Sequence, residues 1–576
     1  MKEKILEYIK ENKIEVAIIS AITLLALILR LIVLYNYGDL WLDELYSWYF
    51  AKQKFIIGTL WKLLTQDLHM PLYFVILHFW TKIFGQSDAS MHLCTIFVSL
   101  PLIPLSYYLM KNLFNKTTGY FSAILFTINT FCIYYSVEVR FYGLVFVLAL
   151  VSAFYFVKML ENLDKKYVLG FIISHSLLMY TFSATPLLTF FYGIVGGVYL
   201  LNKKRDLLLE YCKKFLIVIG IAIPVVIFNI CNIVIMHSNF CSFQKDIYAF
   251  NWNVISDILE NYFTSQNFQI FTGALNVYFN IFTQMQNNIY LIFVFIPIFI
   301  GLGGILKALL EKNDKLYLFL FPSLMFLLST LLLASVGAMS LLTKYTSIIF
   351  PVIICTACYG LSKFNLKILS YITFTIFILL NISFLQFQPM NVYNLHRKEL
   401  GEMPKVMNEI IKPKKDDLFI IPYSGNKVMR YIPQGNILHF YMDDALLLKD
   451  KQSLAQYFDK QFLQYLNRNN VTDYMYEDLA QNKPFILYHI MFQDDILPKL
   501  KKGQRLIIIS YRNGFTESII EGWSKNKPLN TPFNMFSFLM AKVLKDTLQL
   551  SYKYLTFENM YTDENNLYTI FVYKKK

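Results

Sequence analysis

The sequence has little charge. Only 16% of its 576 residues are charged, whereas 56% are hydrophobic and 17% aromatic. This balance excludes a soluble globular domain and predicts a polytopic membrane protein. The formal net charge of +14 is consistent with nucleic-acid binding, but the basic residues fall in short clusters between apolar runs, where they set membrane topology. We therefore expect no nucleic-acid partner.

Cysteine is also scarce, and the seven cysteines lie almost all within hydrophobic runs. Cys355 and Cys358 form a C-x-x-C pattern, but no second ligand pair is nearby, so we expect neither a metal nor a redox site there. There is no tandem repeat and no low-complexity tract. No small-residue cleavage site follows the first apolar run, so we expect that run to be a retained anchor.

Apolar runs of about 20 residues, the length that crosses a bilayer, recur through the first two thirds of the chain. We predict about eleven transmembrane helices, at residues 16–35, 90–110, 118–136, 141–159, 167–182, 185–201, 214–236, 288–309, 316–336, 345–362 and 367–386. The run 71–84 is too short to span and is expected to lie flat on the external face.

Basic residues give the predicted orientation in the cell membrane. Four lysines precede the first span, which places the N-terminus in the cytoplasm. The clusters between later spans then fall on the cytoplasmic side as well. The external face collects the loop 36–89, the segment 134–142, the loop 237–287 and the turn at Lys344.

The composition changes after about residue 387. Strand-like runs appear at 417–423, 437–441, 484–488, 505–511 and 568–573, with a helical stretch at 447–467. The predicted fold is therefore an α-helical polytopic membrane domain at 1–386, followed by an extracytoplasmic soluble α/β domain at 387–576.

Two adjacent carboxylates, Asp43 and Glu44, follow the first span beside Trp41 and Tyr46. Adjacent residues do not share a helix face, so the two are expected to have different roles. One interpretation is a general base toward a hydroxyl; the other is a solvated cap on a juxtamembrane helix. The residues alone leave both open.

Five further polar residues are candidates on the same face. Arg30, inside the first span, either snorkels to the interface or orients a carboxylate. His69 either donates to a phosphate or sugar oxygen or binds interfacial water. Glu138 and Arg140 form either a structural ion pair or a site in which Glu138 contacts the acceptor, a metal ion or Arg30 and Arg140 binds an anion. Lys344 either binds a phosphate or is solvated.

Several of these residues belong to an ordered set of motifs. The set comprises Leu29-Arg30-Leu31, Leu40-Trp41-Leu42-Asp43-Glu44-Leu45-Tyr46-Ser47, His69-Met70-Pro71-Leu72-Tyr73-Phe74, Phe84-Gly85, Tyr135-Ser136-Val137-Glu138-Val139-Arg140-Phe141-Tyr142, and Lys344-Tyr345 followed by Pro351. Over about residues 15–385 this order resembles the bacterial branch of the dolichyl-phosphate-mannose protein mannosyltransferase family, the GT-C glycosyltransferases of family 39 and their relatives.

The resemblance implies an enzyme that takes a sugar from a polyprenyl-phosphate carrier and transfers it, with inversion, outside the cytoplasm. The family's catalytic acidic residue matches Asp43, which becomes the expected base, although the sequence does not decide between Asp43 and Glu44. Glu138 matches the second acidic position, which contacts acceptor, donor or a divalent metal ion. The expected donor-phosphate and substrate-binding residues are Arg30, His69, Arg140, Lys344 and Tyr345.

Three positions depart from the family pattern. Met70 stands where a second proline is frequent, Val137 where Gln is common, and Lys344 where Arg is usual. Lysine binds phosphate without the planar fork of arginine. Because a phosphate leaving group needs little protonation, the chemistry requires cations and one base.

The acceptor stays open between a glycolipid, a cell-surface glycan and a protein, and the transferred group between a neutral sugar, a charged aminosugar and a phospho-substituent. Membrane lipids are the other expected partners. The alternative from another class is a flippase or transporter for lipid-linked sugars without catalysis. It predicts charges at mid-depth and an inverted repeat, whereas the charges here gather at one face and no repeat is visible.

Overall fold

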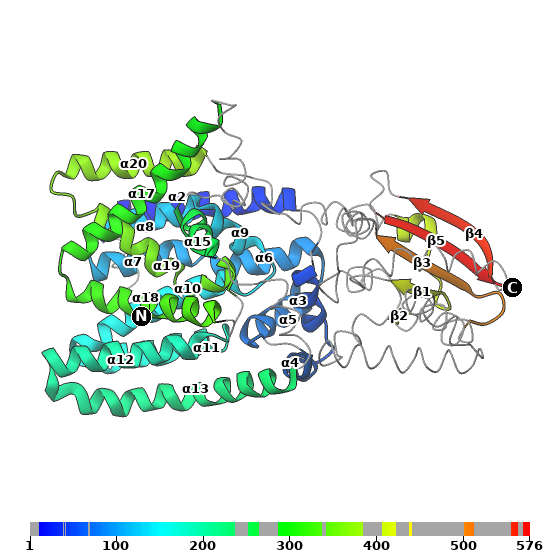
Figure 1. Cartoon of the computed structure of the whole chain (residues 1–576), viewed down its shortest axis with the longest axis horizontal. Helices are drawn as coiled ribbons and strands as arrows, with labels where there is room; N and C mark the ends of the chain where they lie inside the picture. Colours follow the sequence, from blue (N-terminus) through cyan, green and yellow to red (C-terminus); the bar gives the residue numbers. More distant parts are fainter. Residues whose placement is uncertain are drawn as a thin grey trace, which may run out of the picture. The chain divides into compact units, whose positions relative to one another are not determined.

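The chain forms two compact units, one of them mainly helical, in a computed structural model (Figure 1). The structure describes residues 11–37, 40, 42–66, 69–236, 252–263, 286–336, 341–383, 406–421, 437–439, 500–511, 555–562 and 568–576. The helical unit comprises residues 1–38, 46–232 and 248–392, and the second unit comprises 39–45, 233–247 and 393–576. The predicted boundary at 386/387 lies outside the described residues.

The helical elements follow one another through the first two thirds of the chain. They are α2 (Lys13–Tyr37), α3 (Leu42–Ala51), α4 (Ile56–Gln66), α5 (Leu72–Phe84), α6 (Asp88–Ser99), α7 (Leu102–Leu113), α8 (Lys116–Ile128), α9 (Thr130–Val137), α10 (Tyr142–Asn162), α11 (Lys165–Met179), α12 (Thr185–Lys203), η1 (Arg205–Leu207), α13 (Leu208–Met236), α15 (Asn253–Phe263), α17 (Gln286–Leu310), α18 (Asp314–Ser335), η3 (Thr343–Thr346), α19 (Phe350–Leu361) and α20 (Lys367–Ser383).

The prediction of a polytopic helical membrane protein is confirmed. Within the described residues, six helices are long and apolar enough to span a membrane, or seven if the bent pair α8 and α9 is one span. The other predicted spans correspond to shorter helices, α11 and the apolar parts of α17, α19 and α20. The expected interfacial helix is α5, of 13 residues. Its position at the membrane surface stays a prediction.

Helix α10 is the core of the helical unit. In its apolar stretch 89% of the residues are buried, against 28% for α2, because α6, α7, α11, α18 and α19 all pack around it (Figure 1). A helix that is apolar on every side is buried in a core or spans a membrane, and α10 has the surroundings of a core helix. Helix α10 begins next to Arg140. The packing around α10 therefore holds its first turn at the predicted external segment 134–142.

The break between α8 and α9 also positions that segment. The two helices meet at an angle of 60°. Asn129 has extended backbone geometry at the break, and its side-chain oxygen accepts a hydrogen bond from the Cys132 amide at 3.0 Å, which starts a new helix. Its amide group donates to the Tyr262 carbonyl at 2.9 Å. Helix α9 is thereby aimed separately from α8 and held against α15.

Glycines allow α17 and α19 to cross at close range. A Cβ atom built on Gly360 would overlap the Gly304 carbonyl oxygen, whereas a Cβ on Gly303 meets nothing within 4 Å. Small residues permit this kind of backbone approach between membrane helices. The crossing therefore depends on glycine at position 360.

We expect Gly360→Ala to lower stability by about 1–3 kcal/mol, because the added methyl group must push α17 and α19 apart. Thermal unfolding of the purified protein in detergent measures the effect. Gly303→Ala, in the open position of α17, is the matched control and should keep or raise the midpoint, since alanine is the better helix former. Equal midpoints for the two variants would contradict the close crossing.

The second unit contains a five-stranded mixed sheet with the order β2-β1-β3-β5-β4. The strands are β1 (Leu418–Ile421), β2 (Ile437–His439), β3 (Arg505–Tyr511), β4 (Leu555–Thr562) and β5 (Tyr568–Lys575), after a short π-type helix, η4 (Val406–Ile411). Strand β3 pairs in parallel with β1 and antiparallel with β5. Its continuous apolar run is typical of a central strand.

An ion pair ties the start of β3 to the start of β1. The Arg505 side chain donates through Nε to Asp417 Oδ1 at 2.9 Å and through Nη2 to the other carboxylate oxygen. This contact raises the pKa of Arg505. Four predicted strands coincide with β1, β2, β3 and β5, while β4, whose sequence mixes polar and apolar residues, was missed. The predictions for 447–467 and 484–488 lie outside the described residues.

Candidate functional site

The short turn between α9 and α10 carries the buried charges of the site. Its position is fixed from α6, where His92 Nδ1 donates to the Val137 carbonyl at 2.7 Å. At the start of α10, a Cβ on Gly143 would lie only 2.8 Å from Ser99 Cβ. The absence of a side chain at Gly143 lets α10 begin against α6. The turn between α9 and α10 is therefore rigidly supported.

Arg140, in this turn, is held by two segments from earlier in the chain. The side chain is buried. Its Nη2 donates to His69 Nε2 at 2.9 Å, and Nη1 donates to Ser47 Oγ at 3.4 Å. The His69 ring also packs 5.2 Å from the ring of Phe141. Three segments separated by up to 93 residues thus meet at one guanidinium group.

The hydrogen bond from Arg140 determines which nitrogen of the His69 ring carries a proton. A guanidinium group only donates, so His69 Nε2 must accept and carries no proton in this arrangement. Only Nδ1 remains to donate to a phosphate or sugar oxygen. The predicted donor role of His69 is therefore narrowed to one ring nitrogen.

Glu138 and Lys344 come together around two tyrosines. Glu138 is buried and ends α9, with its amide bonded to the Tyr134 carbonyl at 3.0 Å. Glu138 and Lys344 both act electrostatically on the phenols of Tyr135 and Tyr142, whose rings are 5.0 Å apart. Both charged residues, predicted from distant motifs, are therefore within electrostatic range of the same pair of rings.

The turn η3, which carries Lys344 and Tyr345, is anchored by α15. The hydroxyl of Tyr262 donates to the Thr346 carbonyl at 2.8 Å. The amide of Tyr345 bonds to the Leu342 carbonyl at 2.9 Å, which closes the turn. Lys344 Nζ lies 5.7 Å from the centre of the Tyr345 ring. Both predicted residues are only partly exposed.

Asp43 and Glu44 lie in the first turn of α3, where the helix dipole favours negative charge. Glu44 is fully buried, so the interpretation of a solvated cap is wrong for this residue. Asp43 keeps part of its surface exposed. Ser47 follows Asp43 by four residues and therefore shares its helix face. Of the two carboxylates, Asp43 is the more accessible.

Arg30 lies neither at the membrane interface nor beside a carboxylate, the two environments that the sequence predicted. It is fully buried, so it does not snorkel to the interface. Its guanidinium group donates to the carbonyls of Ala26 at 3.0 Å and Phe126 at 3.3 Å, and to Cys132 Sγ at 3.5 Å. None of these partners is a carboxylate. Arg30 instead bridges α2 to both sides of the break between α8 and α9.

Two carboxyl groups that sequence reasoning missed lie on α15, beside η3. Glu260 is fully buried and Asp257 partly buried. Burial raises the pKa of Glu260 to about 8, with a smaller contribution from the charge of Asp257, and burial raises the pKa of Asp257 to about 6. The available signal was their spacing of three residues among apolar side chains, which places both on one face of a helix.

We expect Glu260 to make stability depend on pH. Its ordinary pKa of 4.5 rises to about 8 in the folded protein, so the folded form retains a proton that the unfolded form loses. Stability therefore falls as pH rises from about 4.5 to about 8, by on the order of a few kcal/mol. Between pH 6 and 8, unfolding midpoints should decline for the wild type and stay nearly level for Glu260→Gln.

Asp257→Asn is the comparison variant for this prediction. Because the pKa of Asp257 rises only to about 6, this change should remove pH dependence in a lower window, between about 4 and 6. A Glu260→Gln protein that still lost stability between pH 6 and 8 as the wild type does would show that another group is responsible.

Metal ligands do not form a recognisable group in the part of the chain that the structure describes. No set of three or more His, Cys, Asp or Glu side chains is close enough to hold a metal ion there. Cys355 and Cys358 are both buried free thiols in α19. The metal role of Glu138 stays a prediction.

The architecture is shared with solved membrane proteins. The chain is similar over 98% of its length to 98% of ArnT from Cupriavidus metallidurans in the apo state, with a TM-score of 0.52 and 9% identity. The same protein bound to undecaprenyl phosphate matches with a TM-score of 0.51 and 9% identity, over 97% of both chains. This likeness shows a shared fold, and the GT-C fold predicted from the motifs is confirmed.

A family model matches within this fold. Residues 68–230 match the family described as dolichyl-phosphate-mannose-protein mannosyltransferase. This range includes His69, Glu138 and Arg140, so the predicted resemblance to that family is confirmed for the segment that holds most of the buried charges. No curated protein matches the sequence.

Proposed function

We propose that the protein is an inverting glycosyltransferase that moves a sugar from a polyprenyl-phosphate donor to a hydroxyl acceptor on the extracytoplasmic side of the membrane. The single observation that carries this proposal is the buried Arg140, held at 2.9 Å by His69 and at 3.4 Å by Ser47. A fixed, desolvated guanidinium group is suited to stabilise the charge of a departing phosphate.

One comparison supports the kind of donor that we propose. ArnT from Cupriavidus metallidurans, which shares the fold, has been observed with undecaprenyl phosphate. A polyprenyl phosphate is what remains when a sugar leaves a polyprenyl-phosphate carrier. In this chain, Arg140 and Lys344 are the cations that we assign to its phosphate, and we assign His69, through Nδ1, as a donor to the phosphate or the sugar.

We assign the general base to Asp43. In the proposed step its carboxylate takes the proton of the acceptor hydroxyl while the acceptor oxygen bonds to the anomeric carbon of the sugar. The bond from that carbon to the phosphate oxygen breaks, and the electron pair stays on the phosphate. One base and a set of cations satisfy this reaction without an acid, because the phosphate is a good leaving group. The partial exposure of Asp43 favours it over the fully buried Glu44.

A cell-level experiment tests the proposed function and addresses the acceptor. Envelope lipids, glycans and proteins from cells with and without the gene are compared by mass spectrometry. We expect the deletion strain to lack one glycosylated product and to accumulate the corresponding polyprenyl-phosphate sugar, and the wild-type gene to restore the product while an Asp43→Asn gene does not. Unchanged glycoconjugates in the deletion strain would contradict the proposal.

A further inference from the structure

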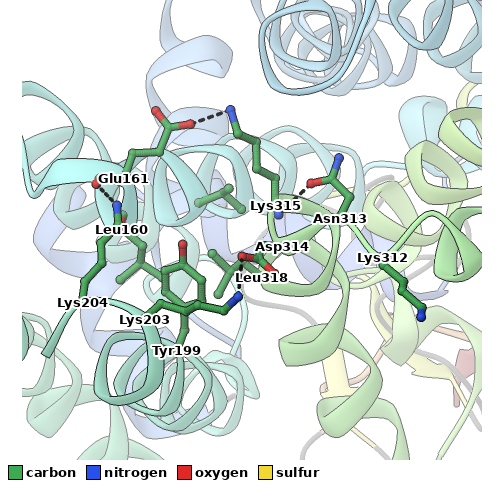
Figure 2. A pocket seen from close by; sticks show the side chains of 11 residues that line it. Leu160, Glu161, Tyr199, Lys203, Lys204, Lys312, Asn313, Asp314, Lys315 and Leu318 are labelled. Carbon is green, nitrogen blue, oxygen red and sulfur yellow. Dashed lines mark hydrogen bonds and ion pairs between the residues drawn. The ribbon is translucent and has the colours of Figure 1, made fainter.

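A cavity of about 700 Å³ lies between α10, α12 and α18, apart from the candidate site (Figure 2). Its walls are formed by Val157, Leu160, Glu161, Tyr199, Lys203, Lys204, Lys312, Asn313, Asp314, Lys315 and Leu318. All of these residues belong to the helical unit. The proposed glycosyl transfer uses none of them.

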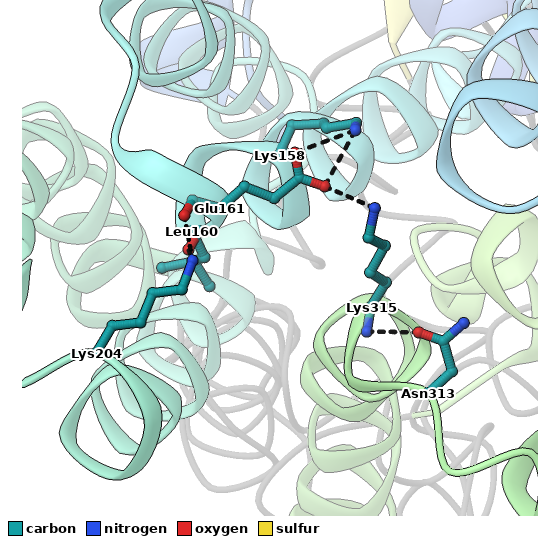
Figure 3. A network of polar contacts seen from close by, with 6 residues as sticks. All are labelled: Lys158, Leu160, Glu161, Lys204, Asn313 and Lys315. Carbon is teal, nitrogen blue, oxygen red and sulfur yellow. Dashed lines mark hydrogen bonds and ion pairs between the residues drawn. The ribbon is translucent and has the colours of Figure 1, made fainter.

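Lysines outnumber carboxylates in this cavity. Four lysines and two carboxylates line it, and a fifth lysine, Lys158, bonds to Glu161 at 3.0 Å from just outside (Figure 3). Lys315 also reaches Glu161, at 2.8 Å, and Lys203 lies 3.6 Å from Asp314. Each carboxylate is therefore already neutralised, and Lys203, Lys204, Lys315 and Lys158 leave an excess of two positive charges.

Three of the four lining lysines converge, whereas Lys312 is directed away from them (Figure 2). Lys204 bonds to the backbone carbonyl of Glu161, so its ammonium group stays at the end of α10. Figure 2 shows Lys203, Lys204 and Lys315, from two different helices, directed to the space around Glu161 and Asp314. The positive-inside rule accounts for lysines at this end of the bundle, but it does not require them to surround a cavity. Converging cations in a recess favour an oxyanion.

The cavity lies at the opposite end of the bundle from the candidate site. Helix α10 starts at Tyr142, beside Arg140, and ends at Asn162, beside Glu161. Its 21 residues span roughly 30 Å at about 1.5 Å per residue, which is the thickness of the bilayer hydrocarbon. The cavity therefore opens at the other membrane face.

Apolar side chains lie in and near the cavity. Val157, Leu160 and Leu318 form part of its wall. On α12, Val198 and Leu201 are 54% and 50% exposed, on other sides of the helix from Lys203. On a membrane helix, exposed apolar residues of this kind face lipid chains. A molecule with a phosphate head and acyl chains would match both features at once.

We propose that this cavity binds the phosphate headgroup of an anionic membrane lipid, with the acyl chains lying along α12. The bound lipid would join α10, α12 and α18 through the phosphate and the lysines, in addition to the direct ion pairs. The proposal does not depend on the glycosyltransferase assignment, because it concerns other residues at the opposite membrane face.

The test is titration of the purified protein in a neutral detergent with dioctanoyl phosphatidylglycerol, followed by native mass spectrometry. Lys203→Gln combined with Lys315→Gln should weaken binding about 25-fold, since one lysine near a membrane phosphate contributes about fivefold. The control is Lys165→Gln combined with Lys166→Gln. These exposed lysines begin α11 directly after α10, so this control removes the same charge from the same end of the bundle without touching the cavity.

Three outcomes decide the proposal. It is supported if the cavity variant loses affinity about 25-fold and the control stays within about threefold of wild type. Equal losses in both variants would show only a general attraction of that face for anions, and would overturn it. Inorganic phosphate that displaced the lipid at equal concentration would also overturn it, because the acyl chains would then contribute nothing. Thermal unfolding of both variants checks that they are folded.

Discussion

Replacement of Asp43 by asparagine is expected to lower the rate of sugar transfer by about 100- to 10,000-fold, the usual contribution of a general base. The change keeps the size of the side chain and removes its ability to accept a proton. Because the base acts on the acceptor hydroxyl, binding of undecaprenyl phosphate should change little. Steady-state transfer and binding of that lipid, measured on the same purified variant, separate the two effects.

Glu44→Gln is the matched control for this prediction, since Glu44 is adjacent in the first turn of α3 but fully buried. We expect it to retain most of the transfer rate. An Asp43→Asn protein with the wild-type rate, together with an inactive Glu44→Gln protein, would move the base to Glu44. Wild-type rates in both would remove the general base from this helix.

The second large effect is expected at Arg140. Arg140→Lys keeps the positive charge but loses the planar fork that bonds His69 and Ser47 together. We expect the turnover rate to fall by about 100- to 1,000-fold, the usual cost of removing one group that stabilises the departing charge. The turnover number should fall more than the Michaelis constant rises, because the contact strengthens as the phosphate leaves.

Arg205→Lys is the control for Arg140. Arg205 is exposed in η1, at the start of the α13 region, and should tolerate the change without loss of rate. A comparable loss in both variants would indicate that arginine replacement harms the protein generally. An unchanged rate in Arg140→Lys would mean that the contacts to His69 and Ser47 do not serve the reaction.

Sequence patterns predicted the parts of this fold in which composition leaves little choice. Apolar runs give the spans, and the continuous strand at Arg505–Tyr511 was predicted with its observed bounds because a buried central strand has no polar interruption. Strand β4 was missed because two consecutive polar residues, Glu558 and Asn559, break its alternation, where its pairing with β5 is also irregular. The motif at residues 138–140 was recognisable because two opposite charges, Glu138 and Arg140, stand close together at the junction of two apolar runs.

What the sequence did not predict depends on contacts between distant segments. Nothing near Arg30 in the chain indicates that its partners are the Phe126 carbonyl and Cys132, about 100 residues away. The bond between Arg140 and His69, and hence which nitrogen of His69 accepts from the guanidinium group, follows only from packing. The burial of Glu260 likewise needs the neighbouring helices, because a carboxylate on an amphipathic helix is ordinarily exposed.

The most direct test of the proposed chemistry is the release of free polyprenyl phosphate by the purified wild-type protein in lipid nanodiscs. Both bilayer faces of a nanodisc share one solution, so transport leaves no product and only bond cleavage is detected. A panel of polyprenyl-phosphate sugars is offered with an envelope extract as the source of acceptor. We predict that one donor yields polyprenyl phosphate together with a new glycosylated product. If no donor is cleaved, while the same protein in sealed vesicles moves labelled lipid-linked sugar across the bilayer, the protein is a transporter and the account is wrong.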